Sequence, residues 1–187
     1  MQYLSDMASP LSELRCLGEP TLEHVDLDLL DAYRFPDGGG FPPSYREMVR
    51  HAGWGRTFGL WLVYPPLLPG FADSWQGRAS VLTRRVVEAY ADGQREDFDW
   101  MVEPDGSWSL VADLCVFGWS ENGDALLWDT GSRGADGELP VWESRGLDSL
   151  HRLGGSLADA LPHLRDRGAL VSGPREHDVE PLPPVRL

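Results

Sequence analysis

The sequence contains no lysine, so all sixteen of its basic residues are arginine. Positive charge is scarce overall, because thirty Asp and Glu residues bring the formal net charge to −14. A chain of this charge repels the phosphate backbone of nucleic acids and anionic membrane surfaces. We therefore expect neither as a direct ligand, whereas a basic protein would be attracted and steered on approach. The alternative is that the acidity only maintains solubility.

Cysteine and long apolar segments are also scarce. Cys16 and Cys115 are far apart and form no Cys-x-x-Cys pair, which argues against a disulfide framework or a zinc site. Residues 1–10 lack the basic and apolar parts of a signal peptide, and no apolar run approaches the ~20 residues needed to cross a bilayer. The sequence therefore predicts a cytoplasmic protein without a membrane anchor.

Recognisable catalytic motifs are missing as well. None of the five histidines stands in a motif with a serine or cysteine nucleophile. The glycine run at residues 38–40 lacks the Lys-Ser/Thr of a phosphate loop and does not follow a predicted strand. Cys115 lies in an apolar segment, where a buried structural thiol is expected. His51 ends a predicted helix, where it can interact with the C-terminal dipole. We expect no enzymatic activity, no metal and no cofactor.

Carboxylate pairs leave one catalytic alternative open. Asp97 with Asp99, Glu121 with Asp124, and Asp129 could perform acid–base chemistry of the kind that glycosidases use. In a chain with thirty acidic residues, such pairs also arise by chance. The Asp-rich loops do not match the spacing of a calcium-binding EF-hand. A carboxylate-based hydrolase is therefore a subordinate hypothesis.

Hydrophobic periodicity and turn signals predict a single-domain α+β protein with an antiparallel or mixed sheet flanked by helices. Helices are expected where apolar residues recur at helical spacing: residues 21–33, 44–52, 78–91 and from 156 onward. The second of these helices begins with a predicted capping box, Ser44 to Glu47. Strands are expected at residues 57–64, 114–119, 125–129 and 139–143. The last three form a β-meander, with Asn122-Gly123 as its first hairpin turn.

Changes in composition suggest an extension at each end of this domain. We assign residues 1–20 to an N-terminal extension and residues 21–165 to the α+β domain. Residues 67–109 form an insertion with a helix of its own. The proline-rich residues 166–187 form a C-terminal tail that is expected to be extended or disordered.

The acidic residues are concentrated in the segment that should build the meander. Residues 96–148 contain thirteen acidic residues and two arginines, whereas residues 34–95 contain eight arginines and five acidic residues. An acidic surface of this kind suits a basic partner. We predict that the partner-binding surface comprises seven residues: Asp97, Asp99, Trp100, Glu103, Trp108, Asp113 and Glu121.

The eight tryptophans are too many for one small core to bury completely. Trp61, Trp119 and Trp128 lie in or beside predicted strands and are expected in the core. Trp100 and Trp108 lie in the polar, acidic stretch and are expected to be exposed. Because tryptophan is enriched at binding hot spots, this pair supports a protein-binding surface.

Several short motifs follow one another along the chain. The predicted helix opening Pro42-Pro43-Ser44-Tyr45-Arg46-Glu47-Met48-Val49 is followed by a glycine-rich turn, Gly53-Trp54-Gly55, and by a strand that ends at Pro65-Pro66. The later motifs are a strand, a Gly-Asp hairpin, a strand ending in Asp, a Pro-Val-aromatic strand and a short helix: 116–119, 123–124, 127–129, 140–142 and 156–161.

This ordered set, over roughly residues 21–165, resembles the SUKH superfamily of Smi/Knr-type domains. The resemblance implies an α+β domain with an antiparallel sheet and flanking helices. Bacterial members resemble immunity proteins, which neutralise toxins delivered between cells by occluding them. Such toxins are often nucleases or deaminases, and the immunity proteins use no cofactor and no catalytic residues.

The residues and the resemblance together predict a cytoplasmic, non-enzymatic protein that binds and neutralises a basic toxin of the nuclease or deaminase type. Nuclease domains tend to be basic where they bind phosphate, which agrees with the acidic charge of this chain. The alternative is a regulatory or scaffold module of the same family that binds a cellular protein.

Overall fold

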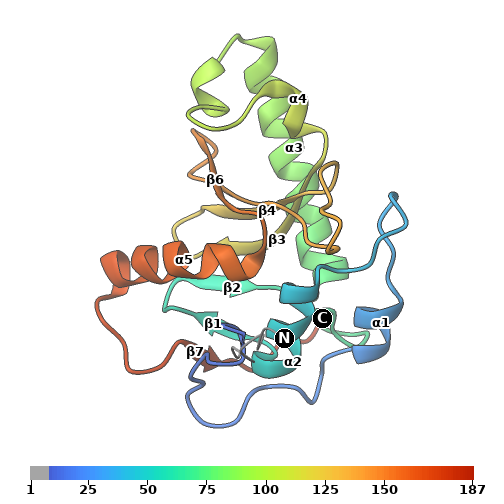
Figure 1. Cartoon of the computed structure of the whole chain (residues 1–187), viewed down its shortest axis with the longest axis vertical. Helices are drawn as coiled ribbons and strands as arrows, with labels where there is room; N and C mark the ends of the chain where they lie inside the picture. The colour runs from blue at the N-terminus through green and yellow to red at the C-terminus, as the bar shows by residue number, and fades with distance from the viewer. Residues whose placement is uncertain (1–8) are drawn as a thin grey trace, which may run out of the picture.

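The computed structural model describes residues 9–187 and is built on a seven-stranded antiparallel sheet (Figure 1). The strands are β1 (Gly55–Thr57), β2 (Trp61–Val63), β3 (Leu114–Ser120), β4 (Ala125–Asp129), β5 (Val141–Ser144), β6 (Leu150–Gly154) and β7 (Val179–Pro181). Their order across the sheet is β6-β5-β4-β3-β2-β1-β7, and every adjacent pair is antiparallel. The predicted α+β class and β-meander are confirmed. Residues 1–8 of the predicted N-terminal extension lie outside the described residues.

Helices flank this sheet. They are α1 (Leu27–Ala32), α2 (Pro43–Ala52), α3 (Ser80–Arg95), α4 (Trp108–Val111) and α5 (Leu157–Ser172). A π-helical turn, η1 (Trp75–Ala79), leads into α3, and a 3-10 turn, η2 (Asp99–Met101), follows it. Within residues 9–187, none of the helices combines the length and apolar character needed to cross a bilayer.

Strand β5 shows how the helices are distributed over the two faces of the sheet. The carboxylate of Glu143 contacts Arg167 of α5, whereas the hydroxyl of the next residue, Ser144, lies 2.8 Å from the hydroxyl of Tyr90 on α3. Neighbouring residues of a strand point to opposite faces. Helices α5 and α3 therefore cover opposite faces of the sheet.

An aromatic cluster fills the core between α2 and the sheet. Trp128 of β4 stacks on Phe117 of β3 with ring centroids 4.4 Å apart, and Tyr45 of α2 meets Trp128 edge-on at 4.8 Å. Trp61 and Trp128 are fully buried, as predicted, while Trp119 is partly buried.

The predicted strand at residues 57–64 is wrong in detail, because this segment forms the β1–β2 hairpin. Phe58 and Gly59 have positive φ angles of 50° and 68°, which reverse the chain between the two strands. The backbone N–H of Leu60 then donates to the carbonyl of Thr57 at 3.1 Å. Apolar residues on both sides of a tight turn resemble one buried strand in the sequence.

The starts of two predicted helices are also corrected. Helix α1 begins at Leu27 rather than near residue 21, and the carboxylate of Asp26 caps it by accepting the N–H of Leu29 at 2.8 Å. Ser44 lies inside α2 and does not form the predicted capping box. Its N–H and hydroxyl both donate to the Glu138 carboxylate, each at 2.7 Å. A distant carboxylate thus replaces the local cap.

The C-terminal segment is more ordered than the sequence suggested. Helix α5 continues to Ser172, and residues 179–181 form β7, which pairs with β1 at the edge of the sheet. Pro181 is tolerated there because an edge strand leaves one side of its backbone unpaired.

Candidate protein-binding surface

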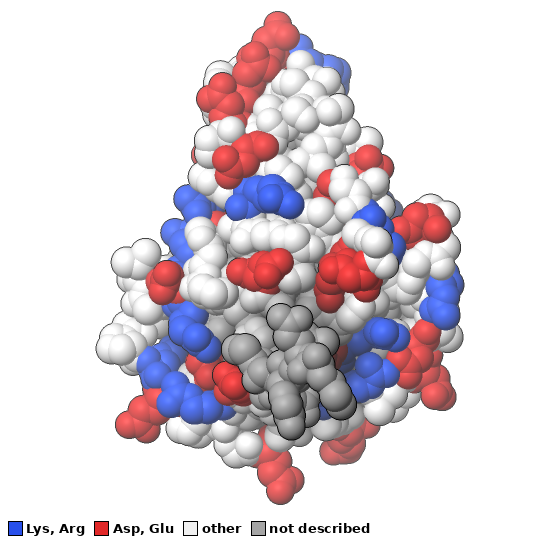
Figure 2. Space-filling model, in the orientation of Figure 1, with Lys and Arg blue, Asp and Glu red and all other residues white. Residues whose placement is uncertain are grey.

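Residues 92–105 form a projection that we name the apex. It begins in the last turn of α3 and includes η2, and it occupies the tip of the molecule (Figure 1). The segment contains six acidic residues and one arginine, Arg95, which forms an ion pair with Asp92. Acidic side chains accordingly gather at the tip in Figure 2. The apex is therefore a negatively charged projection.

The chain reverses tightly after α3 to build the apex. Asp97 has a φ of 57°, a left-handed conformation that Asp and Asn adopt more readily than most residues. The N–H of Phe98 returns to the carbonyl of Gly93 at 2.9 Å. The sulfur of Met101 packs against Gly93, in the space that a Cβ at this position would occupy. Glycine at position 93 therefore leaves room for the side chain of Met101 where η2 folds back on α3.

The base of the apex is attached to the sheet. Met101 and Val102 are buried, and they anchor η2 to the core. The carbonyl of Glu103 accepts the N–H of Leu150 at 2.8 Å, and the N–H of Asp105 donates to the carbonyl of Leu150 at 3.2 Å. These bonds hold the apex against β6.

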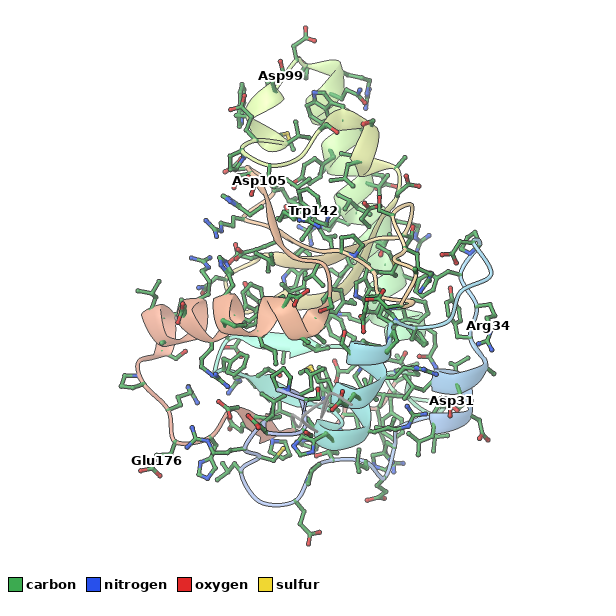
Figure 3. All side chains as sticks on the ribbon, in the orientation of Figure 1. Asp31, Arg34, Asp99, Asp105, Trp142 and Glu176 are labelled. Carbon is green, nitrogen blue, oxygen red and sulfur yellow. The ribbon has the colours of Figure 1, made fainter. Side chains whose placement is uncertain are left out.

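Aromatic side chains are exposed on the apex. Trp100 is 52% exposed and Phe98 is 39% exposed, and their rings stack with centroids 4.5 Å apart. Trp108, which was expected to be exposed, is instead partly buried. Its indole N–H donates to the carboxylate of Asp99 at 2.8 Å (Asp99 is labelled in Figure 3). Exposed aromatic rings surrounded by carboxylates are typical of binding surfaces.

The structure brings together five of the seven residues predicted for the partner-binding surface: Asp97, Asp99, Trp100, Glu103 and Trp108. Asp113 lies lower, between α4 and β3, where its carbonyl accepts the N–H of Thr130 at 2.9 Å. Glu121 lies in the β3–β4 turn and forms an ion pair with Arg56 at 2.6 Å. Since Arg56 belongs to β1, Glu121 is remote from the apex and is not part of this surface.

A second polar cluster lies between β5 and α5. Glu143 is fully buried, and its oxygens lie 2.9 Å from Arg145 Nε, 3.1 Å from Arg167 Nε and 3.2 Å from His163 Nε2. Arg167 also binds Asp124 at 2.9 Å. The signal in the sequence was the i, i+4 spacing of His163 and Arg167 on α5, which places both on one helix face.

The structure separates one of the predicted carboxylate pairs, Glu121 with Asp124. Asp124 is buried against Arg167, while its predicted companion Glu121 is exposed and bound to Arg56. Among the residues described, no group of three or more His, Cys, Asp or Glu could hold a metal ion.

The cysteine expected to be structural is Cys115, in β3. Burial raises the pKa of its thiol to about 11, so the thiol stays protonated near neutral pH. A protonated thiol is a poor nucleophile.

Comparisons of this chain with known protein families, with curated proteins and with solved structures find no significant match.

Proposed function

We propose that this chain is a non-enzymatic binding protein that neutralises a basic toxin domain by direct contact, as the SUKH resemblance implies. The acidic apex, with the exposed Phe98–Trp100 pair at its tip, is the observation that carries the proposal. In this account the protein works in the cytoplasm and needs no cofactor.

The apex combines the two properties that a basic partner requires. The stacked rings offer apolar area that is lost from water when a partner covers it, and one such anchor is worth ~2 kcal/mol or more. The surrounding carboxylates attract a positive surface and raise the association rate at low salt. A nuclease domain is basic in the cleft that binds phosphate, so a projecting acidic apex is suited to enter and block that cleft.

The proposal is tested with purified secreted toxin domains of the source organism and the full chain as bait at moderate salt. We expect a stoichiometric complex with a basic domain, and loss of its nuclease or deaminase activity on binding. Failure with every toxin domain, together with binding to an ordinary cellular protein, would favour the regulatory or scaffold module instead.

Charge variants locate the surface. Asp97→Asn with Asp99→Asn removes two charges, and Asn tolerates the left-handed backbone at position 97 and still accepts a hydrogen bond from Trp108. We expect slower association and a weaker dependence on salt. The matched control is Asp166→Asn on the exposed side of α5, which should change neither.

A further inference from the structure

A hollow of about 370 Å³ lies just below the apex, between α4 and the ends of β4 and β5. Three carboxylates, those of Asp105, Asp113 and Asp129, line it together with the ring of Trp142. Figure 3 labels Asp105 and Trp142 below Asp99, so the hollow adjoins the proposed binding surface. We name it the Asp129 hollow.

Asp129 differs from the other buried carboxylates. Asp124, Glu143 and Asp178 each form an ion pair with at least one arginine. Asp129 is only 6% exposed, yet within residues 9–187 it forms no ion pair. Because buried carboxylates are normally paired, Asp129 lacks a positive group that the chain supplies elsewhere.

The fold directs this carboxylate into the hollow. Leu127 pairs with Trp142 across β4 and β5, and Asp129 lies two residues beyond Leu127, so Asp129 and Trp142 project from the same face. One oxygen of Asp129 accepts the N–H of Gly131 at 3.0 Å, while its other oxygen receives no hydrogen bond from any described residue. A hydrogen-bonding position therefore remains open on the hollow side.

The other two carboxylates add negative charge without a cation of their own. Asp113 lies against Gly131, since a Cβ on that glycine would come within 2.6 Å of an Asp113 oxygen. Asp105 accepts the backbone N–H of Arg152 at 3.1 Å. In the described part of the chain, the guanidinium of Arg152 forms no ion pair with these carboxylates. The hollow thus holds three negative charges that no side chain of the described residues neutralises.

Trp142 forms part of the wall of the hollow. The residue is 7% exposed, and its indole N–H finds no acceptor among the described residues, which is also true of Trp54, Trp75 and Trp128. Because the indole nitrogen is itself enclosed, a ligand in the hollow contacts the Trp142 side chain without bonding its N–H. The group that a ligand can reach is the carboxylate of Asp129, and a cationic side chain of a polypeptide suits it.

We propose that the Asp129 hollow receives an arginine side chain of the same basic protein that docks on the apex. This inference rests on the proposed function. A planar guanidinium can bond a carboxylate with two N–H groups and also lie against an aromatic ring, which a lysine ammonium does less well.

The test uses the full chain labelled with ¹⁵N and two small probes, N-acetyl-arginine amide and the uncharged N-acetyl-citrulline amide. The indole N–H resonance of Trp142, assigned by comparison with Trp142→Phe, reports on the hollow. We expect the arginine probe to shift this resonance with a dissociation constant of about 10 mM, as suits one charged side chain without a protein attached. Citrulline should leave it in place.

Asp129→Asn is the decisive variant, because Asn keeps the acceptor for Gly131 and removes the charge. It should abolish the shift caused by arginine, while Asp166→Asn on α5 should retain it. Equal shifts with citrulline, an unchanged response in Asp129→Asn, or no shift with arginine would each overturn the inference.

The same variant separates this inference from the proposed function. If a basic toxin domain binds wild type and Asp129→Asn equally, the toxin-binding role stands and the arginine site is refuted. If arginine shifts Trp142 but no toxin domain binds, the cation site stands and the toxin-binding role fails. Both ideas together predict at least tenfold weaker toxin binding by Asp129→Asn.

Discussion

The ion cluster around Glu143 offers a sharp test of what stabilises the fold. Glu143→Gln removes the charge of a fully buried side chain and keeps its size. Arg145 and Arg167 then lose the carboxylate that both of them bind, at 2.9 and 3.1 Å. The cluster joins β5 to α5, so its loss should weaken the whole domain.

The expected magnitude follows from burial. Breaking a fully buried ion pair by removing one partner costs about 3–5 kcal/mol. The side chains of Arg145 and Arg167 are 33% and 26% exposed, so water replaces part of what they lose. We therefore expect a loss of about 2–3 kcal/mol, which for a domain of this size lowers the Tm by about 5–10 °C.

Thermal and urea unfolding, followed by circular dichroism, measure this loss. The matched control is Asp129→Asn, which removes the charge of another buried carboxylate on the same sheet. Asp129 has no ion pair within the described residues, and Asn keeps the hydrogen bond from Gly131, so we expect a change within about 0.5 kcal/mol or a gain in stability. A Glu143→Gln variant that is no less stable than Asp129→Asn would refute this reasoning.

Three further predictions concern other sites. The hydrogen bond from Arg133 is the main cause that holds the pKa of Asp37 below its ordinary value of 3.8. The Asp37–Arg133 pair therefore stabilises the fold above about pH 3.8, and this stabilisation is lost as the pH falls through the pKa that Asp37 has in the folded state. Asp37→Asn should therefore lower the Tm more at pH 6 than at pH 2, and equal losses at both would contradict this. Cys115, with its pKa near 11, should react with iodoacetamide at pH 8 about 100-fold more slowly in the native protein than in urea; equal rates would contradict its burial. Gly93→Ala should displace the side chain of Met101 and alter apex resonances in NMR spectra; an unchanged spectrum would contradict the close contact between Met101 and Gly93.

Strong local signals allowed parts of the fold to be predicted from the sequence. The β3–β4 hairpin was predicted because Asn122-Gly123 accepts the backbone angles of a tight turn, and helix α2 because its apolar residues fall on one face. Strands β6 and β7 were missed. Strand β6 contains His151 and Arg152 and lacks clear alternation, and β7 is three residues long and ends in proline. Such strands depend on their neighbours in the sheet for stability.

The candidate site, like the fold, was predictable from the sequence only in part. Trp100 in an acidic stretch indicated an exposed aromatic residue, and the structure agrees. The position of Glu121 was not predictable, because its ion pair with Arg56 joins residues that are distant in the sequence. The sequence also could not show that Asp124 forms an ion pair with Arg167 whereas Asp129 forms none within the described residues, since this depends on which buried carboxylate Arg167 reaches.

The central claim is that the apex binds a basic toxin domain, and titration calorimetry with Trp100→Ala tests it most directly. Leu170→Ala is the control, because Leu170 is an exposed apolar residue on α5, outside the apex. We predict that Trp100→Ala weakens binding by about 30-fold, corresponding to ~2 kcal/mol, and that Leu170→Ala changes it less than about twofold. Equal affinities for wild type and Trp100→Ala would contradict the claim.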